Sequence, residues 1–322
     1  MVSFIVIGKN EGDRLMLCLS SIKKIIDKYC HKVDFEVIYV DSKSTDGTID
    51  RIKNNYPEVR IILLTGDCNA AIGRNVGAKE ASGDVLVFLD GDMEIDTDYL
   101  FDTVLDDNFK MKYPLCNGNL NDVNYTKDWK FVNEIERSIV EKDTFQRTMG
   151  GAFIIDRALW NHVGGMDNCF VKSQDIELGS RLTKLGYPVK HYARHSIRHH
   201  TIPYYNRPLK VQMRNDRYGM VIVRRNLFSK VLFTYSLREQ TMPILLMGSL
   251  VLALVLSFIT PFWWAVFSLY LLLNFYRAAK KGLKTFVRQF FSGILLDLSQ
   301  IRAFLFFYPE RKNYVISYKK IN

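Results

Sequence analysis

The sequence predicts an α/β protein whose N-terminal part builds a mostly parallel sheet. Three observations lead to this fold class. Short β-branched runs alternate with segments of helical periodicity, and polar residues directly follow several of these runs. Hydrophobic residues make up 48% of the 322 positions and charged residues 24%, which is enough apolar material for a large core. Because strands that alternate with helices are joined by crossovers, consecutive strands are expected to lie parallel.

The individual elements follow from these patterns. Four runs have the length and composition of buried strands: residues 2–8, 35–41, 59–65 and 85–90. Apolar residues at helical spacing separate the first two runs: Leu15, Leu19, Ile22 and Ile26. The first run is too short for the apolar region of a signal peptide and meets Lys9 and Glu11 at once, so it is expected to be a strand. The five cysteines are odd in number and show no C-x-x-C spacing. We therefore expect reduced cysteines in a cytosolic domain.

The net charge of +10 belongs to the C-terminal third. From residue 201 onward there are 18 Lys and Arg against 4 Asp and Glu, whereas the first 200 residues carry 26 against 30. The basic residues flank an apolar segment and form no recognisable nucleic-acid module. They therefore indicate a membrane surface, with no nucleic-acid partner.

That apolar segment runs from Gln240 to Tyr276 without a charged residue. A single helix of this length would extend roughly 55 Å, well beyond the ~30 Å apolar core of a bilayer. Pro261 lies midway, so the segment is expected to be a transmembrane or re-entrant helical hairpin. Because both flanks are basic, the positive-inside rule predicts that both ends lie in the cytoplasm.

Acidic residues gather where the expected strands end. The stretch VFLDGDM places Asp90 and Asp92 after a buried strand, while Asp41 and the segment Gly8 to Glu11 follow two others. Ligands of parallel sheets bind at the carboxyl ends of the strands. Paired carboxylates there favour a divalent cation, Mg2+ or Mn2+, that bridges to substrate phosphates, although a solvated acidic turn would also explain the pair alone. The sequence contains neither G-x-G-x-x-G nor a Walker A motif.

Five segments, in order, resemble the inverting nucleotide-sugar glycosyltransferases of family 2, which have the GT-A fold. They are SFIVIGKNEGDRL, VIYVDSKSTDGT, GRNVGAKEASGDVLVFLDGDM, GGAFIIDRALWNHVGGMD and SQDIELGSRLTKLGY, and they cover residues 1–205. The segment Arg217-Tyr218-Gly219 resembles the interfacial helix of membrane-associated members that add single sugars to exopolysaccharide repeat units. The resemblance implies a GT-A nucleotide-diphospho-sugar transferase fold (Rossmann-like, mostly parallel sheet) with a C-terminal α-helical membrane-associated region.

The resemblance also implies roles for the donor-binding positions. Asp41 matches the aspartate that contacts the nucleobase, Gly8 to Glu11 would line the nucleoside pocket, and Arg74 would lie near the base and the diphosphate. Asp90 and Asp92 match the DXD motif, in which the ribose-phosphate and the metal are held.

Catalysis would depend on Asp175, which matches the general base of a Glu-Asp motif. Gln174 replaces the glutamate of that motif. An aspartate before a helical segment also serves as an N-terminal cap, so this alternative stays open. Four of the six histidines cluster in HYARHSIRHHT, where His199 is the first choice for a further metal ligand and His200 the second.

These implications divide the chain into four parts. Residues 1–205 would be the GT-A catalytic domain, 206–239 basic amphipathic interfacial helices, 240–276 the hairpin and 277–322 a basic amphipathic C-terminal segment, part of which (283–308) either spans the membrane or lies on it. The expected activity is transfer of a sugar from a UDP-sugar to a lipid-linked acceptor, such as a polyprenyl diphosphate, at the inner leaflet of the inner membrane, with both termini cytoplasmic. A nucleotidyltransferase and a non-catalytic nucleotide-sugar binding module are the alternatives. The sequence leaves open whether the protein is an oligomer.

Overall fold

The computed structural model describes residues 1–202, 208–231, 233, 240–280, 282 and 285–321. The chain divides into two compact units. The first comprises Met1–Asn206 together with Lys312–Asn322, and the second comprises Arg207–Arg311. The sequence analysis placed 277–322 in one C-terminal segment. The structure differs, because the last residues pair with the sheet of the first unit.

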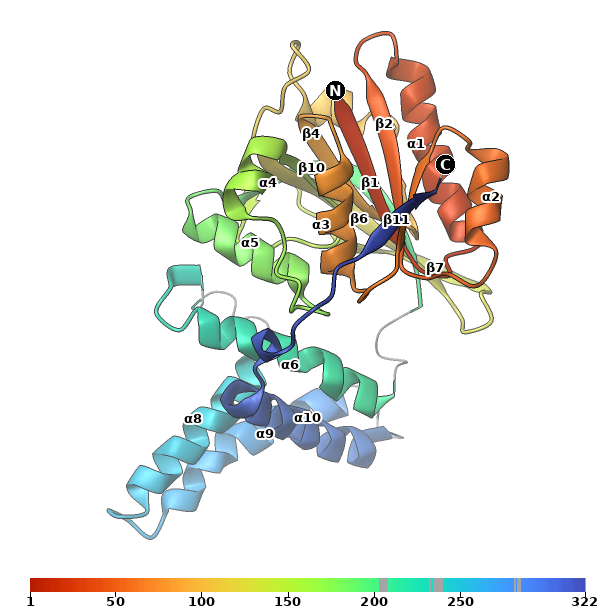
Figure 1. Ribbon diagram of the computed structural model, residues 1–322. Coiled ribbons are helices and arrows are strands. Elements are labelled where there is room, and N and C mark those ends of the chain that lie inside the picture. Colours follow the sequence, from red (N-terminus) through yellow and green to blue (C-terminus); the bar gives the residue numbers. More distant parts are fainter. Residues whose placement is uncertain (203–207, 232, 234–239, 281, 283–284, 322) are drawn as a thin grey trace. The chain divides into compact units, whose positions relative to one another are not determined.

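The first four strands lie parallel at the N-terminal side of the sheet (Figure 1). They are β1 (Val2–Gly8), β2 (Phe35–Asp41), β3 (Arg60–Leu64) and β4 (Val85–Asp90). Three helices connect them: α1 (Asp13–Tyr29), α2 (Thr48–Asn55) and α3 (Ala70–Glu80). The predicted strands are confirmed, with β3 one residue shorter at each end than the apolar run.

The remaining strands make the sheet mixed, so the prediction of a mostly parallel sheet is wrong. The strand order is β11-β3-β2-β1-β4-β9-β6-β10-β5, with β7 beside β6 and β8 beside β10, and most of the later pairs are antiparallel. The regular alternation of strand and helix ends at β4, and of the later pairs only β10 with β6 is parallel in the described sheet. The later elements are β5 (Met93–Ile95), a short π-helix (Leu100–Val104), β6 (Leu115–Tyr125), β7 (Phe131–Ser138), β8 (Thr144–Gln146), β9 (Phe153–Asp156), α4 (Arg157–Val163), α5 (Gln174–Lys184), β10 (Val189–Thr201) and β11 (Tyr318–Ile321).

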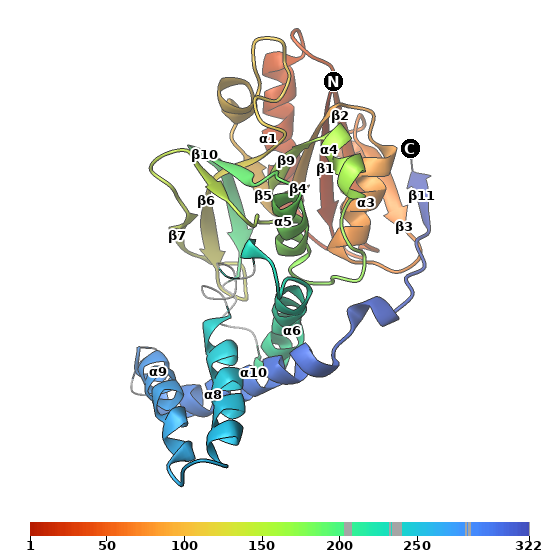
Figure 2. The same ribbon diagram turned by 90° about the vertical axis from the view of Figure 1, so that its left-hand side faces the viewer.

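Side chains of the central strands point alternately into two apolar layers. In β1, Phe4 and Val6 pack in the layer beneath α1, whereas Ile5 and Ile7 pack in the layer beneath α3. Figure 2 shows α1 and α3 on opposite sides of the sheet. Gly77 lets α3 approach closely, since a Cβ there would lie 2.4 Å from a methyl group of Ile5. Because both faces are covered, the functional groups gather at the strand ends.

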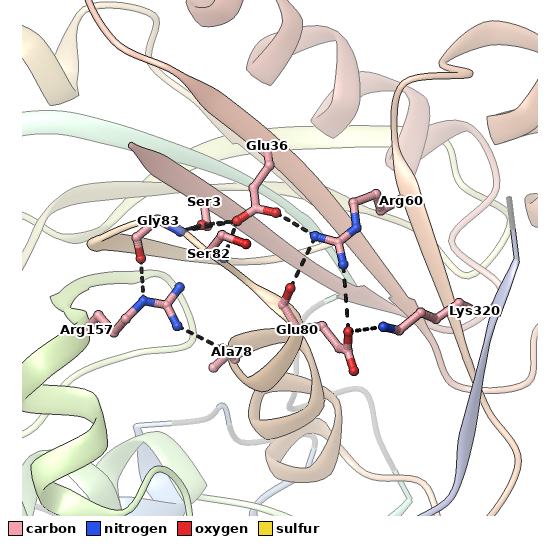
Figure 3. Close-up of polar contacts among 9 residues, drawn as sticks. All are labelled: Ser3, Glu36, Arg60, Ala78, Glu80, Ser82, Gly83, Arg157 and Lys320. Carbon is pink, nitrogen blue, oxygen red and sulfur yellow. Dashed lines mark hydrogen bonds and ion pairs between the residues drawn. The ribbon is translucent and has the colours of Figure 1, made fainter.

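At the amino ends of the strands, opposite the predicted site, a polar network ties β1, β2, β3 and α3 together (Figure 3). Glu36 accepts hydrogen bonds from the Ser3 hydroxyl (2.6 Å) and the Gly83 N–H (3.3 Å), and pairs with Arg60 Nη1 (2.7 Å). Arg157 donates through Nε to the Gly83 carbonyl (2.6 Å). Burial opposes ionisation of Glu36, but these hydrogen bonds and the charge of Arg60 lower its pKa.

The C-terminal strand β11 joins this network from the far end of the chain. It pairs antiparallel with β3, and Lys320 Nζ lies 2.6 Å from Glu80 Oε2 at the end of α3 (Figure 3). The Tyr318 hydroxyl donates to Glu80 Oε1 (2.7 Å). Just upstream, Asp67 accepts from the Val315 N–H (3.0 Å). We call residues 312–321 the C-terminal strap; it completes the sheet of the first unit.

The second unit is helical. Its main elements are α6 (Leu209–Arg225), α8 (Thr241–Leu256), a 3-10 turn (Trp263–Val266), α9 (Phe267–Ala279), α10 (Phe286–Phe306) and a second 3-10 turn (Pro309–Arg311). Asp297 of α10 is buried and binds the Tyr270 hydroxyl (2.9 Å) and Arg277 Nη2 (2.9 Å) of α9. This buried ion pair fixes α9 against α10.

The helices on either side of Pro261 are short. α8 has 16 residues and α9 has 13, so that α8 extends about 24 Å against the ~30 Å of a bilayer core. Over the parts of the chain for which coordinates are given, no helix combines the length and apolar character that crossing a membrane requires. The transmembrane form of the predicted hairpin is therefore not found.

Candidate active site

Three parallel strands end side by side at one edge of the sheet. Gly8 at the end of β1 is in register with Asp41 at the end of β2, and Ile7 is in register with Asp90 at the end of β4. The loop after β4 is fastened to β1, because the Gly91 N–H donates to the Ile7 carbonyl (2.8 Å). The expected gathering of these groups at one sheet edge is therefore confirmed.

Asp41 is fully buried and fixed by two hydrogen bonds. Its carboxylate accepts from the Tyr39 hydroxyl (3.1 Å) and from the Ser44 N–H (2.8 Å). The loops after β1 and β2 meet here, since the Asn10 N–H donates to the Ser44 hydroxyl (2.9 Å). Gly8 is required beside them, because a Cβ would lie 3.0 Å from the Tyr39 hydroxyl. These hydrogen bonds fix Asp41, the residue predicted to contact the nucleobase, between the loops that follow β1 and β2.

Arg74 of α3 is the cation that compensates Asp90. Its side chain is 1% exposed, and Nη2 lies 2.6 Å from Asp90 Oδ1 and donates to the Gly151 carbonyl (3.1 Å). Position 151 must be small, since a Cβ there would lie 2.9 Å from Asp90 Oδ2. The Nε and Nη1 atoms of Arg74 have no hydrogen-bond partner among the described residues. A buried guanidinium with unused donors is suited to binding phosphate oxygens.

Asp92 is compensated by a different arginine. Arg14, in the first turn of α1, lies 2.9 Å from Glu11 Oε2 through Nη2 and 3.9 Å from Asp92 Oδ2 through Nη1. Burial raises the pKa of Glu11 to about 7; the negative charge of Asp92 adds to this effect and Arg14 partly offsets it. Glu11 and Asp92 therefore form a crowded acidic pair that a bound cation would relieve.

His199 of β10 reaches Asp92. Its Nε2 lies 3.5 Å from Asp92 Oδ2, while its Nδ1 lies 2.7 Å from Asp122 Oδ1 on β6. Burial lowers the pKa of His199, but hydrogen bonds and charges of Asp122 and Asp92 outweigh it and raise the pKa to about 9. In the absence of a ligand the imidazole is thus a cation beside the two carboxylates.

His200 points away from this group. Successive residues of a strand face opposite sides, and both ring nitrogens of His200 are occupied: Nε2 lies 2.6 Å from Glu94 Oε1 and Nδ1 lies 2.9 Å from the Tyr125 hydroxyl. The structure brings the imidazole of His199 to the Asp92 carboxylate, whereas His200 meets Asp92 only through its backbone N–H, which donates to the Asp92 carbonyl (2.8 Å).

The surroundings of Asp92 fit a hard divalent cation. Asp92 Oδ1 is buried without a hydrogen-bond partner among the described residues. His199 directs Nε2 toward Asp92 while a carboxylate holds its other nitrogen, which is the arrangement that orients histidine ligands of metals. No cluster of three or more His, Cys, Asp or Glu side chains suited to a metal occurs in the described ranges. Two protein ligands suffice where substrate phosphates complete the coordination sphere.

Asp175 lies in the first turn of α5 and is half-buried. Burial raises its pKa; the positive charge of Arg74 opposes this and the negative charge of Asp90 adds to it. Asp175 therefore lies within electrostatic reach of the Arg74–Asp90 pair. The side-chain oxygen of Gln174 is buried without a hydrogen-bond partner in the described structure. Ser173 occupies the N-cap position with φ of 58° and makes no side-chain capping hydrogen bond, and Asp175 lies inside the helix, so Asp175 is not its N-terminal cap.

Sequence reasoning missed three residues around Asp92: Arg14, Asp122 and Trp129. Arg14 follows Glu11 at helical spacing, which is a signal for an ion pair. Asp122 and Trp129 belong to the β6–β7 hairpin, whose strands carry no helix-strand alternation to place them. The guanidinium carbon of Arg14 lies 3.9 Å from the centre of the Trp129 ring.

Comparison with protein families gives one match over the N-terminal half. Residues 3–161 match the family model described as glycosyl transferase family 2. The matched residues include Asp41, Arg74, Asp90 and Asp92. Asp175 and His199 lie beyond the matched residues.

Curated relatives of this chain include two named glycosyltransferases. The chain is 25% identical over 199 residues to the glycosyltransferase AglE of Haloferax volcanii, covering 58% of this chain and 62% of that protein. It is 31% identical over 103 residues to the poly(ribitol-phosphate) beta-glucosyltransferase of Bacillus spizizenii, covering 31% of this chain and 16% of that protein. The matched region thus spans less than two thirds of the length of either relative.

Solved structures with this fold include a crystal structure of S. aureus TarS, residues 1–349, in complex with UDP-GlcNAc. It has a TM-score of 0.57 at 15% identity and covers 94% of this chain and 90% of that chain. The mannosyltransferase PcManGT from Pyrobaculum calidifontis, in complex with GDP-Man and Mn2+, has a TM-score of 0.57 at 16% identity, covering 95% and 87%. At these identities the likeness establishes the fold, a GT-A-like α/β fold with a mixed sheet.

Proposed function

We propose that this protein transfers a sugar from a UDP-sugar to a hydroxyl group of an acceptor, with inversion at the anomeric carbon. The observation that carries the proposal is the convergence of two compensated carboxylates, Arg74–Asp90 and His199–Asp92, at one sheet edge that is built mainly by a family 2 domain. Each pair leaves polar groups unused: two N–H donors of Arg74 and one buried oxygen of Asp92. Cationic donors and a metal-binding oxygen are what a sugar diphosphate requires.

In this mechanism Asp175 is the general base. It would remove the proton of the attacking acceptor hydroxyl, whose oxygen then bonds to the anomeric carbon as the bond to UDP breaks. Arg74 would hold a phosphate oxygen of the leaving UDP, and Asp41 the nucleobase. Asp92 and His199 would hold Mg2+ or Mn2+, which when bound neutralises the charge that develops on the diphosphate. The raised pKa of Asp175 favours it as a proton acceptor, because a stronger base withdraws the proton more effectively.

Relatives support the choice of donor. TarS is solved in complex with UDP-GlcNAc and PcManGT with GDP-Man and Mn2+, so the same fold accommodates sugar nucleotides in both. A nucleotidyltransferase would release pyrophosphate instead of a nucleoside diphosphate, and a binding module would release neither. Titration of the full-length protein with UDP, UMP and GDP, with and without Mn2+, tests the proposal. Tight binding of UDP is expected, and absence of binding by every nucleotide would overturn it.

The second unit supports a membrane-borne acceptor at the inner leaflet. Large apolar side chains around the α8–α9 turn are strongly exposed: Phe258 at 85%, Ile259 at 73% and Phe262 at 68%. Exposed apolar surface of this extent on a basic unit suits the interface of an anionic membrane. Part of the basic 206–239 segment lies outside the described residues, namely 206–207, 232 and 234–239. A lipid-linked acceptor, such as a polyprenyl diphosphate, would be met there.

The pairing of the last strand with the N-terminal sheet supports the proposal that both chain termini lie in the same compartment. β11 pairs with β3 in the sheet that contains β1, so the two ends of the chain lie on the same side of any membrane. We place that side in the cytoplasm, because basic residues flank the 240–276 segment on both sides. Reporters fused before Met1 and after Asn322 should both score cytoplasmic, and a difference between them would contradict this placement.

A further inference from the structure

Trp129 occupies the tip of the β6–β7 hairpin, at the last position of a three-residue loop, which in such loops takes the left-handed conformation. The Trp129 N–H donates to the Thr126 carbonyl (3.1 Å) and closes the turn. Its φ is 58°, in the left-handed region that side chains with a Cβ enter at a cost of about 1–2 kcal/mol. The residue nevertheless remains 44% exposed. The turn accounts for the backbone conformation but not for a large exposed indole, so the side chain is available to a ligand.

The indole is joined to the catalytic edge through Arg14. The guanidinium carbon lies 3.9 Å from the ring centre, and the same guanidinium lies 3.9 Å from Asp92. Tyr125, whose ring centre lies 5.6 Å from that of Trp129, holds His200 through its hydroxyl. The hairpin tip therefore lies one side chain away from the Asp92 carboxylate.

The sheet order separates Trp129 from the predicted nucleobase position. Asp41 ends β2, on one side of β1, whereas β4, β9, β6 and β10 follow on the other side. Trp129 follows β6, beside the strand that carries His199. A donor whose base lies at Asp41 and whose diphosphate lies at Asp92 leaves the hairpin tip to the acceptor.

We propose that Trp129 is the platform on which the terminal pyranose ring of the acceptor stacks. The inference rests on the proposed function and names the acceptor class: a carbohydrate whose ring presents an axial C–H face. Such C–H groups carry partial positive charge and are attracted to the electron-rich face of an indole. Arg14 holds the ring in place by the cation–π contact. Trp129 is thus a specificity-determining residue for the acceptor.

Direct binding tests this with methyl glycosides of glucose, galactose, mannose and N-acetylglucosamine, each added to the full-length protein in saturating UDP and Mn2+. The indole N–H signal of Trp129 is identified by its loss in Trp129→Phe. At least one glycoside is expected to shift this signal, whereas sorbitol, which has hydroxyls but no ring face, leaves it unchanged. No shift with any of the four glycosides, or an equal shift with sorbitol, would overturn the proposal.

Substitutions separate this role from structural effects. By saturation-transfer measurements, Trp129→Ala should weaken glycoside binding about five- to tenfold, the scale of one aromatic contact, while Trp129→Phe stays within about twofold. Phe131→Ala is the matched control, because Phe131 is 63% exposed on the same hairpin and, among the described residues, makes no cation–π contact. Equal weakening by Phe131→Ala, or weaker UDP binding in Trp129→Ala, would contradict the assignment. Failure of the wild-type protein to bind UDP would instead overturn the proposed function.

Discussion

Arg74, buried to 99%, donates through Nη2 to Asp90 Oδ1 at 2.6 Å, so the first carboxylate of the DGD sequence is neutralised by the protein itself. The second, Asp92, faces Arg14 and His199 at longer range, 3.9 and 3.5 Å, and keeps one buried oxygen without a partner. The two carboxylates therefore have different roles. In the proposed mechanism, Asp90 orients an arginine toward the diphosphate, and Asp92 is available to a metal.

Replacing Arg74 tests the first role. Arg74→Lys keeps the charge but loses the fork of donors, so UDP binding should weaken tenfold or more, roughly the loss of one charge-assisted hydrogen bond. Calorimetric titration with UDP measures it. Arg157→Lys is the matched control, since Arg157 also donates to backbone carbonyls in α3 and its vicinity but at the opposite end of the strands (Figure 3). Equal UDP affinities in wild type and Arg74→Lys would remove Arg74 from the site.

The two histidines give a direct test of the metal ligand. His199→Gln should weaken Mn2+ binding in the presence of UDP by about 10- to 100-fold, whereas His200→Gln should leave it unchanged, because His200 bonds to Glu94 and Tyr125 instead. Asp92→Ala should abolish the metal dependence of UDP binding. Electron paramagnetic resonance of Mn2+ measures the bound fraction. The reverse order of effects in the two histidine variants would show that the wrong residue is assigned.

Asp175→Asn separates binding from chemistry. The amide keeps the shape of the side chain but cannot accept the acceptor proton, so turnover should fall roughly 10²-fold or more while the affinity for UDP is retained. Asp156→Asn is the control, because Asp156 caps α4 through the N–H groups of Ala158 and Leu159 and has no role in the site. Weaker UDP binding with normal turnover at saturation would contradict the assignment of Asp175 as the base.

The C-terminal strap should be necessary for a stable first unit. Lys43 donates to the Gly66 carbonyl (2.7 Å), and the N–H of Gly66 donates to Ser317 (3.1 Å), so the strap supports the loop beside Asp41. A chain ending at residue 230 should therefore lose thermal stability and UDP affinity together. Joining residues 312–322 to residue 206 through a Gly/Ser linker should restore both. This revises the expectation that residues 1–205 alone bind the donor; full UDP affinity in the chain ending at 230 would reinstate it.

The thermal stability of the protein should decrease at acidic pH, because protonation of Glu80 removes a stabilising interaction. Hydrogen bonds from Lys320 and Tyr318 lower the pKa of Glu80 below its ordinary value of 4.5. A carboxylate whose pKa is lower in the folded protein contributes stability that is complete above the unfolded pKa and is lost as pH falls through the folded pKa. The melting temperature of the full-length protein should drop more steeply below about pH 4.5 than that of Glu80→Gln. Parallel curves for the two proteins would show that the strap contact contributes nothing.

The parts of the fold and of the candidate site that could be predicted are those fixed by residues close together in the sequence. The first four strands and the gathering of Asp41, Asp90 and Asp92 follow from local periodicity, because βαβ connections fix where parallel strands end. The antiparallel half of the sheet and β11 depend on pairings between distant segments, which no local pattern records. The sequence gives no reason to prefer His199 to His200 as a metal ligand. In the structure, the strand register places the two imidazoles on opposite sides of β10, where His199 contacts Asp122 and His200 contacts Glu94.

Acceptor-dependent release of UDP tests the central claim most directly. The full-length protein in bilayers containing lipid-linked sugar acceptors is incubated with Mn2+ and a panel of UDP-sugars, beside Asp175→Asn under the same conditions. The account predicts that one donor releases UDP only when acceptor is present, that the sugar appears on the acceptor with inverted anomeric configuration, and that Asp175→Asn does neither. Release of pyrophosphate or UMP, retention of configuration, or equal release by Asp175→Asn would contradict it.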